Sequence, residues 1–172
     1  RNEQGKQFQN VTTAGGFGNL QKGHAVAFAD LDHDGDQDIF VNMGGANYGD
    51  VYQNSLFENP YSNSVDANHW ITLQLIGTES NQMAIGVRIK IVISEQGQSR
   101  AIFREVNSGG SFGGNTLRQE IGLGSSNMID SLQISWPASQ SVQIFTDVKA
   151  NQFLTITEGA QHNEIVMRKT SD

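Results

Sequence analysis

The stretch Asp30-Leu-Asp-His-Asp-Gly-Asp-Gln-Asp38 places five carboxylates within nine residues. Two short apolar runs flank it, His24-Ala-Val-Ala-Phe-Ala29 before it and Ile39-Phe-Val-Asn-Met43 after it. Both runs are bounded by glycine and are rich in β-branched and aromatic residues, which is typical of strands. We therefore predict an antiparallel hairpin whose two strands are joined by this segment, called the acidic loop below (residues 30–38).

The spacing of the aspartates in the acidic loop suits a calcium ion. The first, third and fifth positions offer carboxylate oxygens, Gly35 at the sixth permits a sharp turn, and the seventh can offer a backbone carbonyl. A carboxylate at the ninth position can close the shell, and calcium prefers such a cage of oxygens. The predicted ligands of Ca²⁺ are Asp30, Asp32, Asp34, Asp36 and Asp38.

The acidic loop begins like an EF-hand but differs from one further on. Its twelfth position is Val41, where an EF-hand requires a bidentate Glu. Magnesium keeps its waters and seldom takes an all-protein cage, so calcium is the preferred ion. The alternative is an acidic surface turn without a metal, in which the carboxylates would repel one another.

Composition excludes several function classes. The 172 residues include no cysteine, which removes thiolate catalysis, disulfides and cysteine-based metal sites. The aspartates of the acidic loop account for most of the formal charge of −7, and no basic stripe is left that could follow a phosphate backbone, so we expect no nucleic-acid partner. No apolar run is long enough for a transmembrane segment. Nineteen glycines and only two prolines indicate a turn-rich, all-β chain.

We expect three segments along the chain. Residues 1–62 contain further short apolar runs at Phe8–Thr12 and Ser55–Asn59, and with the hairpin they are typical of one β-propeller blade. An isolated blade leaves apolar surface uncovered, so we expect missing neighbour blades in a longer protein or self-association through this blade. Residues 68–160 form a second domain, and residues 161–172 a C-terminal tail.

The second domain shows longer alternating patterns. In residues 70–76, for example, Ile71, Leu73 and Leu75 share one face, and such alternation is the mark of a half-buried strand. Seven such segments, separated by Gly, Ser, Asn or Pro, predict an antiparallel β-sandwich or barrel-like domain. The predicted strands are 70–76, 87–93, 100–107, 117–123, 131–136, 141–145 and 153–157.

Short motifs in this domain carry a family resemblance. They are His69-Trp-Ile-Thr-Leu73, Gly77 through Asn81, Ala84-Ile-Gly-Val-Arg88, Val106 through Phe112, Ile121-Gly-Leu-Gly124, Ile129-Asp130, Ile134-Ser-Trp-Pro137 and Ile156-Thr-Glu158. The segment from Trp70 to Glu158 resembles the ASPIC/UnbV domain, the C-terminal module of cartilage acidic protein and of many bacterial secreted proteins. The preceding Ala27-Phe-Ala-Asp30 through Phe40-Val41 resembles a propeller repeat of the FG-GAP or VCBS type.

The resemblance implies a function as well as a fold. The family is secreted, periplasmic or on the cell surface, and it binds calcium through its propeller repeats. The chain would be the C-terminal portion of a larger, propeller-containing protein that serves adhesion or interaction with an extracellular protein or glycan. No catalytic residue is defined for the family, so we expect no enzyme.

A second candidate function is carbohydrate recognition by the loops of the sandwich. It would require exposed aromatic side chains, and the sequence offers Trp70, Trp136 and Phe112. Both tryptophans fall within strand patterns, so we expect them in the core. We expect Phe112 to tuck into the end of the sandwich and hold its glycine-rich loop.

A third candidate is a hydrolase. The segment Gly109-Gly-Ser-Phe-Gly113 matches a nucleophile elbow around Ser111, and His162 is the histidine available after it. An elbow needs a helix after the turn, whereas the segment that follows here predicts a strand. Asp130 and Glu158 could be a carboxylate pair for glycoside hydrolysis, but their positions at strand ends suit solvated turn residues better.

Overall fold

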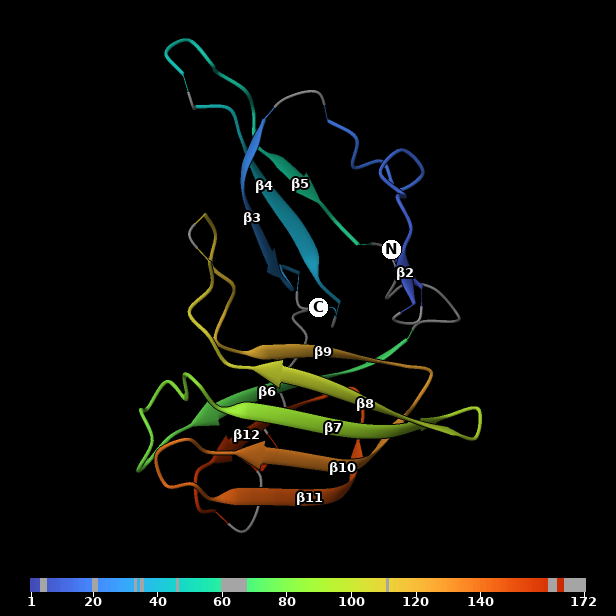
Figure 1. The fold of residues 1–172 in the computed structure, drawn as a ribbon, viewed down its shortest axis with the longest axis vertical. Helices are drawn as coiled ribbons and strands as arrows, with labels where there is room; N and C mark the ends of the chain where they lie inside the picture. The colour runs from blue at the N-terminus through green and yellow to red at the C-terminus, as the bar shows by residue number, and fades with distance from the viewer. Residues whose placement is uncertain are drawn as a thin grey trace.

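The computed structural model describes residues 1–3, 6–19, 22–32, 34, 36–45, 47–59, 68–110, 112–160 and 164–165. These residues contain strands and turns but no helix, so the predicted all-β class is confirmed. Figure 1 shows two parts, a small N-terminal sheet and a larger sandwich of two sheets beneath it.

The N-terminal sheet contains the predicted hairpin. Strands β3 (Gly23–Ala29) and β4 (Asp38–Met43) pair antiparallel, and β5 (Ser55–Phe57) pairs with β4 on the other side. Ahead of them, the short strands β1 (Asn2–Glu3) and β2 (Gln7–Phe8) pair with each other.

The prediction of a strand over Phe8–Thr12 is wrong beyond Phe8. Strand β2 ends at Phe8, and the chain then folds into turns. The amide N–H of Gly15 donates to the carbonyl of Val11 at 2.7 Å, and that of Phe17 donates to the carbonyl of Thr12 at 3.1 Å. The carbonyl groups of Val11 and Thr12 are therefore bonded locally and are not used for pairing with another strand.

The sandwich consists of two four-stranded sheets with strand orders β11-β10-β7-β8 and β13-β12-β6-β9. All seven predicted strands are present, with ends shifted by a few residues. Their bounds are β6 (His69–Ile76), β7 (Arg88–Glu95), β8 (Gln98–Glu105), β9 (Gln119–Gly124), β10 (Met128–Ser135), β11 (Val142–Lys149) and β12 (Gln152–Thr157), followed by β13 (Glu164–Ile165).

The sheets are not antiparallel throughout. Strand β12 pairs with β6 in parallel, with Leu154 opposite Leu73. Side-chain alternation predicts which face of a strand is buried, but it carries no information about the direction of the neighbouring strand. In the segment expected to be a tail, β13 adds to the outer side of β12.

The core lies between the two sheets of the sandwich. The alternating residues predicted to face inward are buried, and each such side chain contributes about 1.5–3 kcal/mol to stability. The apolar side chains with at most 2% exposure are Ile71, Leu73, Leu75, Ala84, Val87, Ile89, Ile91, Ile93, Val106, Ile121, Leu123, Ile129, Leu132, Ile134, Trp136, Leu154 and Ile156. The sandwich therefore has its own continuous apolar core.

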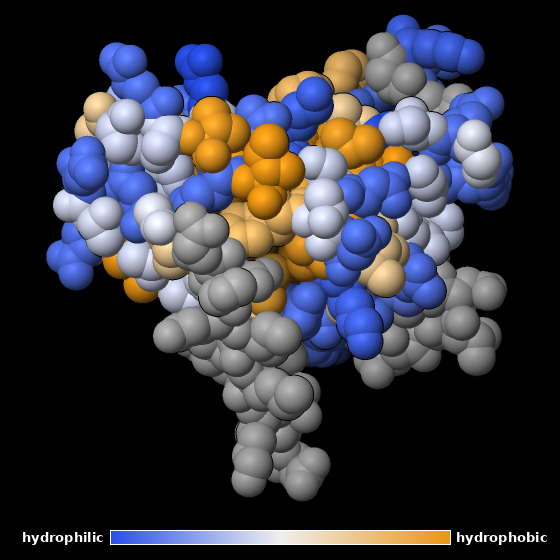
Figure 2. Space-filling model, turned by 90° about the horizontal axis from the view of Figure 1, so that it is seen from below, coloured by the Kyte–Doolittle hydropathy of each residue, from blue (hydrophilic) through white to orange (hydrophobic). Residues whose placement is uncertain are grey.

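The outer surface of the sandwich also carries apolar side chains. Figure 2 views the molecule from the side of β11, the outermost strand of its sheet, and apolar surface is visible there between polar residues. On β11, Val142 and Ile144 are 51% and 62% exposed.

The long loop between β8 and β9 of the sandwich contacts the N-terminal sheet. Asn115 in this loop accepts a hydrogen bond through Oδ1 from the backbone N–H of Phe28 at 3.2 Å. At Gly113 the loop approaches β3 so closely that a Cβ would clash with the carbonyl of Val26, and φ there is +146°. Nearby, Nε2 of Gln37 donates to Oε2 of Glu120 at 2.6 Å. These contacts place the acidic loop against the sandwich.

Candidate metal centre

The hairpin brings both ends of the acidic loop together. Asp30 directly follows β3, Asp38 is the first residue of β4, and Ala29 is the register partner of Asp38. Asp30 and Asp38 are each only 4% exposed, whereas Asp32 is exposed to solvent. The loop is therefore anchored at a buried base and projects its middle residues outward.

Three of the five predicted ligands converge. One carboxylate oxygen from each of Asp30, Asp32 and Asp34 lies within 4.8 Å of the other two. In an extended strand these three residues would share a face but would be spaced about 6.6 Å apart, or about 13 Å from the first to the third. Convergence of all three within 4.8 Å therefore shows that the chain curls around a common centre here. Asp36 and Asp38 do not belong to this group of converging oxygens.

Backbone N–H groups hold the converging carboxylates in place. The N–H of Asp34 donates to Oδ1 of Asp30 at 3.1 Å and to Oδ1 of Asp32 at 3.4 Å. The N–H of Asp36 donates to Oδ1 of Asp34 at 3.1 Å. Such turns, in which an Asp side chain accepts from the backbone two residues on, are a property of this residue type. The geometry of the site therefore follows from the local sequence.

Asp38 ties the base of the acidic loop to the end of β5. Its Oδ2 accepts a hydrogen bond from the N–H of Leu31 at 3.2 Å, and its Oδ1 accepts one from the N–H of Asn59 at 2.9 Å. A carboxylate has about four lone-pair sites, so these bonds are compatible with a metal as well. Asp38 thus has a structural role that the sequence did not reveal.

The donor set fits a hard cation. Among the described residues of the loop, the converging atoms are carboxylate oxygens, which calcium prefers, with no nitrogen or sulfur ligand. His33 and Gly35, which the sequence places at intervening positions, lie outside the described residues. The predicted calcium site is therefore compatible with the geometry of Asp30, Asp32 and Asp34.

The other candidate sites from the sequence have different outcomes. Ser111 and His162 lie outside the described residues, but the chain after Gly113 leads into strand β9 and not into the helix that a nucleophile elbow requires. Trp136 is 2% exposed, as predicted, and Trp70 is half-buried against Phe153 with ring centroids 5.1 Å apart. The two tryptophans do not form an exposed platform.

Two predictions about single residues are wrong. Phe112 does not tuck into the sandwich, because it is 72% exposed. Glu158 is not solvated but 6% exposed, and its carboxylate accepts hydrogen bonds from residues 78–80 and from Ser139. Its partners lie far away in the sequence, so no local pattern indicated them. Asp130 is exposed as expected and accepts a hydrogen bond from the hydroxyl of Ser94.

The fold and these contacts define a two-sheet β-sandwich protein with an N-terminal hairpin that carries an acidic loop. The family described as ASPIC and UnbV matches residues 77–163, slightly more than half of the chain. The chain therefore belongs to the ASPIC and UnbV family, as the motifs in the sequence indicated.

The match begins directly after β6, covers strands β7 to β12, and does not include the acidic loop. None of the curated proteins or solved structures compared with the chain matches it significantly. Among the described residues, no helix is long and apolar enough to cross a membrane.

Proposed function

We propose that the acidic loop binds one calcium ion and that the protein is a calcium-stabilised interaction module without enzymatic activity. The observation that carries this proposal is the convergence of the oxygens of Asp30, Asp32 and Asp34 within 4.8 Å. Without a cation, these carboxylates repel one another. With calcium bound, the same oxygens become its ligands, and their attraction to the cation outweighs the repulsion between the carboxylates.

Calcium would act on more than the loop itself. The loop contains Gln37, which contacts Glu120 of the sandwich, and Asp38, which holds Asn59 after β5. An ion that fixes the loop would therefore also stiffen the end of the N-terminal sheet and its contact with the sandwich. The ion would hold the two parts of the molecule in one relative arrangement in which they can contact a partner.

The biological setting is part of the proposal. A calcium loop between two strands of a three-stranded antiparallel sheet is consistent with a propeller repeat of the FG-GAP or VCBS type. We propose a secreted, periplasmic or cell-surface location, where calcium is plentiful, and a role in adhesion or binding to an extracellular protein or glycan. The ASPIC and UnbV family membership supports this setting.

A thermal melt tests the calcium proposal. The protein is unfolded in excess EDTA, in millimolar calcium and in millimolar magnesium. At a free calcium concentration one hundred times Kd, binding adds about 2.7 kcal/mol to the free energy of unfolding. We expect a clear rise in Tm with calcium and a smaller one with magnesium. Identical melting curves in EDTA and calcium, together with no heat of binding in calorimetry, would overturn the proposal.

A further inference from the structure

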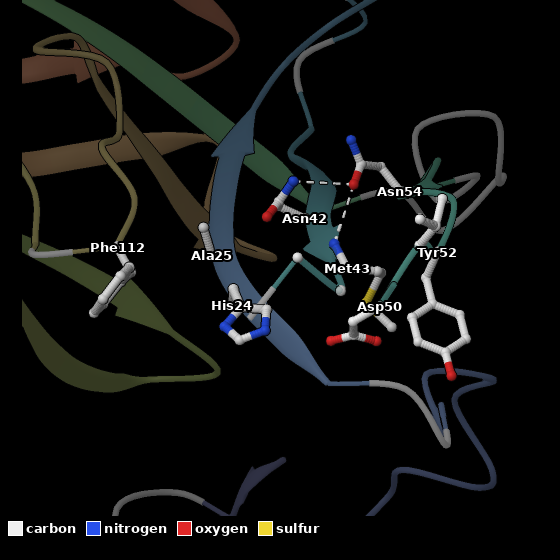
Figure 3. Close-up of a pocket in the computed structure, with 11 residues that line it drawn as sticks. His24, Ala25, Asn42, Met43, Asp50, Tyr52, Asn54 and Phe112 are labelled. Carbon is white, nitrogen blue, oxygen red and sulfur yellow. Dashed lines mark hydrogen bonds between the residues drawn. The ribbon is translucent and has the colours of Figure 1, made fainter. Parts of the chain in front are cut away.

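A second site lies at the opposite end of the hairpin from the acidic loop. It is a pocket of about 600 Å³, bounded by the first residues of β3, the last residues of β4, the connection that follows β4, and Phe112 of the sandwich. Ligand pockets of proteins commonly have volumes of about 300–1,000 Å³. Figure 3 shows polar side chains pointing into this space from three segments of the chain.

His24 reaches the pocket because β3 is irregular at this point. Gly23 pairs with Met43 and Ala25 pairs with Asn42, so His24 is an extra residue with no partner of its own in β4. Such a β-bulge redirects a side chain, and bulges are frequent next to functional sites. The Nε2 atom of His24 is buried and makes no hydrogen bond to any described residue.

Asp50 reaches the pocket from the connection after β4. The N–H of Asp50 donates to the carbonyl of Asn47 at 3.0 Å, and its own carbonyl accepts from the N–H of Gly45 at 2.8 Å. A Cβ at Gly44 would lie 2.9 Å from the carbonyl oxygen of Asp50, so glycine is needed for this close approach. Oδ2 of Asp50 is buried and, within the described part of the chain, has no hydrogen-bond partner.

Both residues therefore line one pocket, and each has a buried side-chain atom without a hydrogen-bond partner in the described part of the chain. A buried donor or acceptor without a partner destabilises the fold, and a ligand that reaches these atoms and completes their hydrogen bonds would remove that penalty. Asn42 and Asn54 supply further polar groups. Nδ2 of Asn42 donates to Oδ1 of Asn54 at 3.0 Å, which also accepts from the N–H of Met43 at 3.1 Å. This arrangement orients both amides at the pocket, as Figure 3 shows.

The remaining wall of the pocket is apolar and partly aromatic. Phe112 and Tyr52 are 72% and 48% exposed, and Met43 lies at the base with 5% exposure. No lysine or arginine is present among the described residues that line it, whereas Asp50 is acidic. An anionic ligand would be repelled, and a purely apolar ligand would leave the polar atoms unsatisfied.

We propose that this pocket binds a neutral saccharide. Hydroxyl groups both donate and accept, so they can satisfy the Asp50 carboxylate, the His24 ring nitrogen and the two amides at once. The C–H face of a sugar ring can pack against Phe112 or Tyr52. This site is separate from the acidic loop and does not involve the tryptophans of the sandwich.

Titration of the whole chain with small saccharides tests this proposal. Glucose, galactose, mannose, N-acetylglucosamine and their common disaccharides are added one at a time, and amide chemical shifts are followed by NMR. We expect saturable shifts at residues of the pocket for at least one sugar, with Kd in the millimolar range. Absence of saturable shifts for every sugar would overturn the proposal. Saturation by methylammonium, with no sugar binding, would also overturn it and would assign the pocket to a cation.

Variants connect the binding to the pocket. Asp50→Asn removes the charge but keeps the shape, and Phe112→Ala removes the aromatic wall. Each is expected to weaken binding of the bound sugar about tenfold, equivalent to about 1.4 kcal/mol. Phe103→Ala is the matched control, because Phe103 is 65% exposed on β8 and does not line the pocket. Equal affinity of Asp50→Asn, Phe112→Ala and the unchanged protein would place the sugar elsewhere and refute the assignment.

The same titration in EDTA and in calcium separates this proposal from the first. Most of the pocket wall belongs to the hairpin and to the connection after β4, at the other end of the hairpin from the acidic loop. Sugar binding is therefore expected in both conditions, and EDTA should weaken it only through the contact with Phe112. Sugar binding without any effect of calcium on Tm would refute the calcium site alone. A calcium effect without sugar binding would refute only the pocket.

Discussion

Glu158 and Ser80 form a buried junction between the end of β12 and the turn after β6. Oε2 of Glu158 accepts the backbone N–H of Ser80 at 2.7 Å, and Oε1 accepts the hydroxyl of Ser80 at 2.8 Å. The backbone N–H groups of Thr78 and Glu79 and the hydroxyl of Ser139 donate to the same carboxylate. One side chain thus satisfies three consecutive backbone N–H groups of a tight turn.

The first prediction concerns the stability that Glu158 provides. Burial by itself raises the pKa of Glu158, but the hydrogen bonds from Ser139, Ser80 and Thr78 outweigh it and lower the pKa from 4.5 to about 2. Glu158→Gln keeps the shape but places an amide NH₂ where an acceptor is needed. We expect the free energy of unfolding at pH 7 to fall by about 1–3 kcal/mol, measured by urea denaturation.

The pH dependence of this effect has a defined sign. Because the folded pKa is lowered, the stabilisation by Glu158 is complete above pH 4.5 and is lost as the pH falls towards 2. The stability difference between the unchanged protein and Glu158→Gln should therefore shrink over that interval. Glu79→Gln alters an exposed neighbouring side chain and is the control. The difference in free energy of unfolding between this variant and the unchanged protein should not shrink in this way over the same pH interval. A constant difference from pH 7 to pH 2 would contradict the assignment.

The second prediction concerns Asp32 as a calcium ligand. Asp32 is exposed, and its Oδ1 accepts a long hydrogen bond of 3.4 Å from the backbone N–H of Asp34. Asp32→Ala is expected to abolish most of the calcium-dependent rise in Tm while leaving the Tm in EDTA unchanged or slightly higher, because one repelling charge is gone. Asp147→Asn, which removes an exposed charge on β11, should keep the full calcium effect. Equal calcium shifts in the two variants would exclude Asp32 as a ligand.

The third prediction distinguishes Asp38 from Asp32. Both oxygens of Asp38 accept backbone hydrogen bonds, from Leu31 and Asn59. Asp38→Asn can satisfy only one of these N–H groups, so it should cost about 1–3 kcal/mol even in EDTA and should weaken calcium binding as well. Calorimetric titration measures calcium affinity, and melting in EDTA measures the structural part. A normal Tm in EDTA would show that the two hydrogen bonds contribute little.

The fourth prediction tests the contact between the N-terminal sheet and the sandwich. The side chain of Asn115 provides the acceptor for the N–H of Phe28 on the outer strand β3. Asn115→Ala should speed hydrogen exchange of the Phe28 amide, which NMR can follow. Asn115→Asp retains an oxygen at this position and should restore slow exchange. Fast exchange at Phe28 already in the unchanged protein would show that the two parts separate freely.

The fifth prediction is self-association through the N-terminal sheet. Phe40 and Leu56 share one face of this sheet and are 40% and 59% exposed, and Val26 and Phe28 on the opposite face are 46% and 38% exposed. Light scattering should show a mass that rises with protein concentration. Leu56→Glu should reduce this rise, whereas Ile144→Glu on the sandwich should not. A monomer at all practical concentrations would contradict the prediction.

The sequence by itself determined the local features of this protein. Alternating apolar residues and glycine-rich turns predicted all seven strands of the sandwich, because burial of one strand face imposes a period of two on the sequence. The hairpin around the acidic loop was equally evident. The convergence of Asp30, Asp32 and Asp34 depends on carboxylates that accept from backbone groups two to four residues away, so its cause is local as well.

The tertiary structure alone decided everything that depends on distant partners. The parallel pairing of β6 with β12, the burial of Glu158 and the exposure of Phe112 each arise from segments far apart in the chain. The pocket of His24 and Asp50 depends on a bulge in β3 and on the loop after β8. A periodic pattern predicts which side of a strand is buried. Which strand or loop covers that side depends on packing between segments that are far apart in the chain.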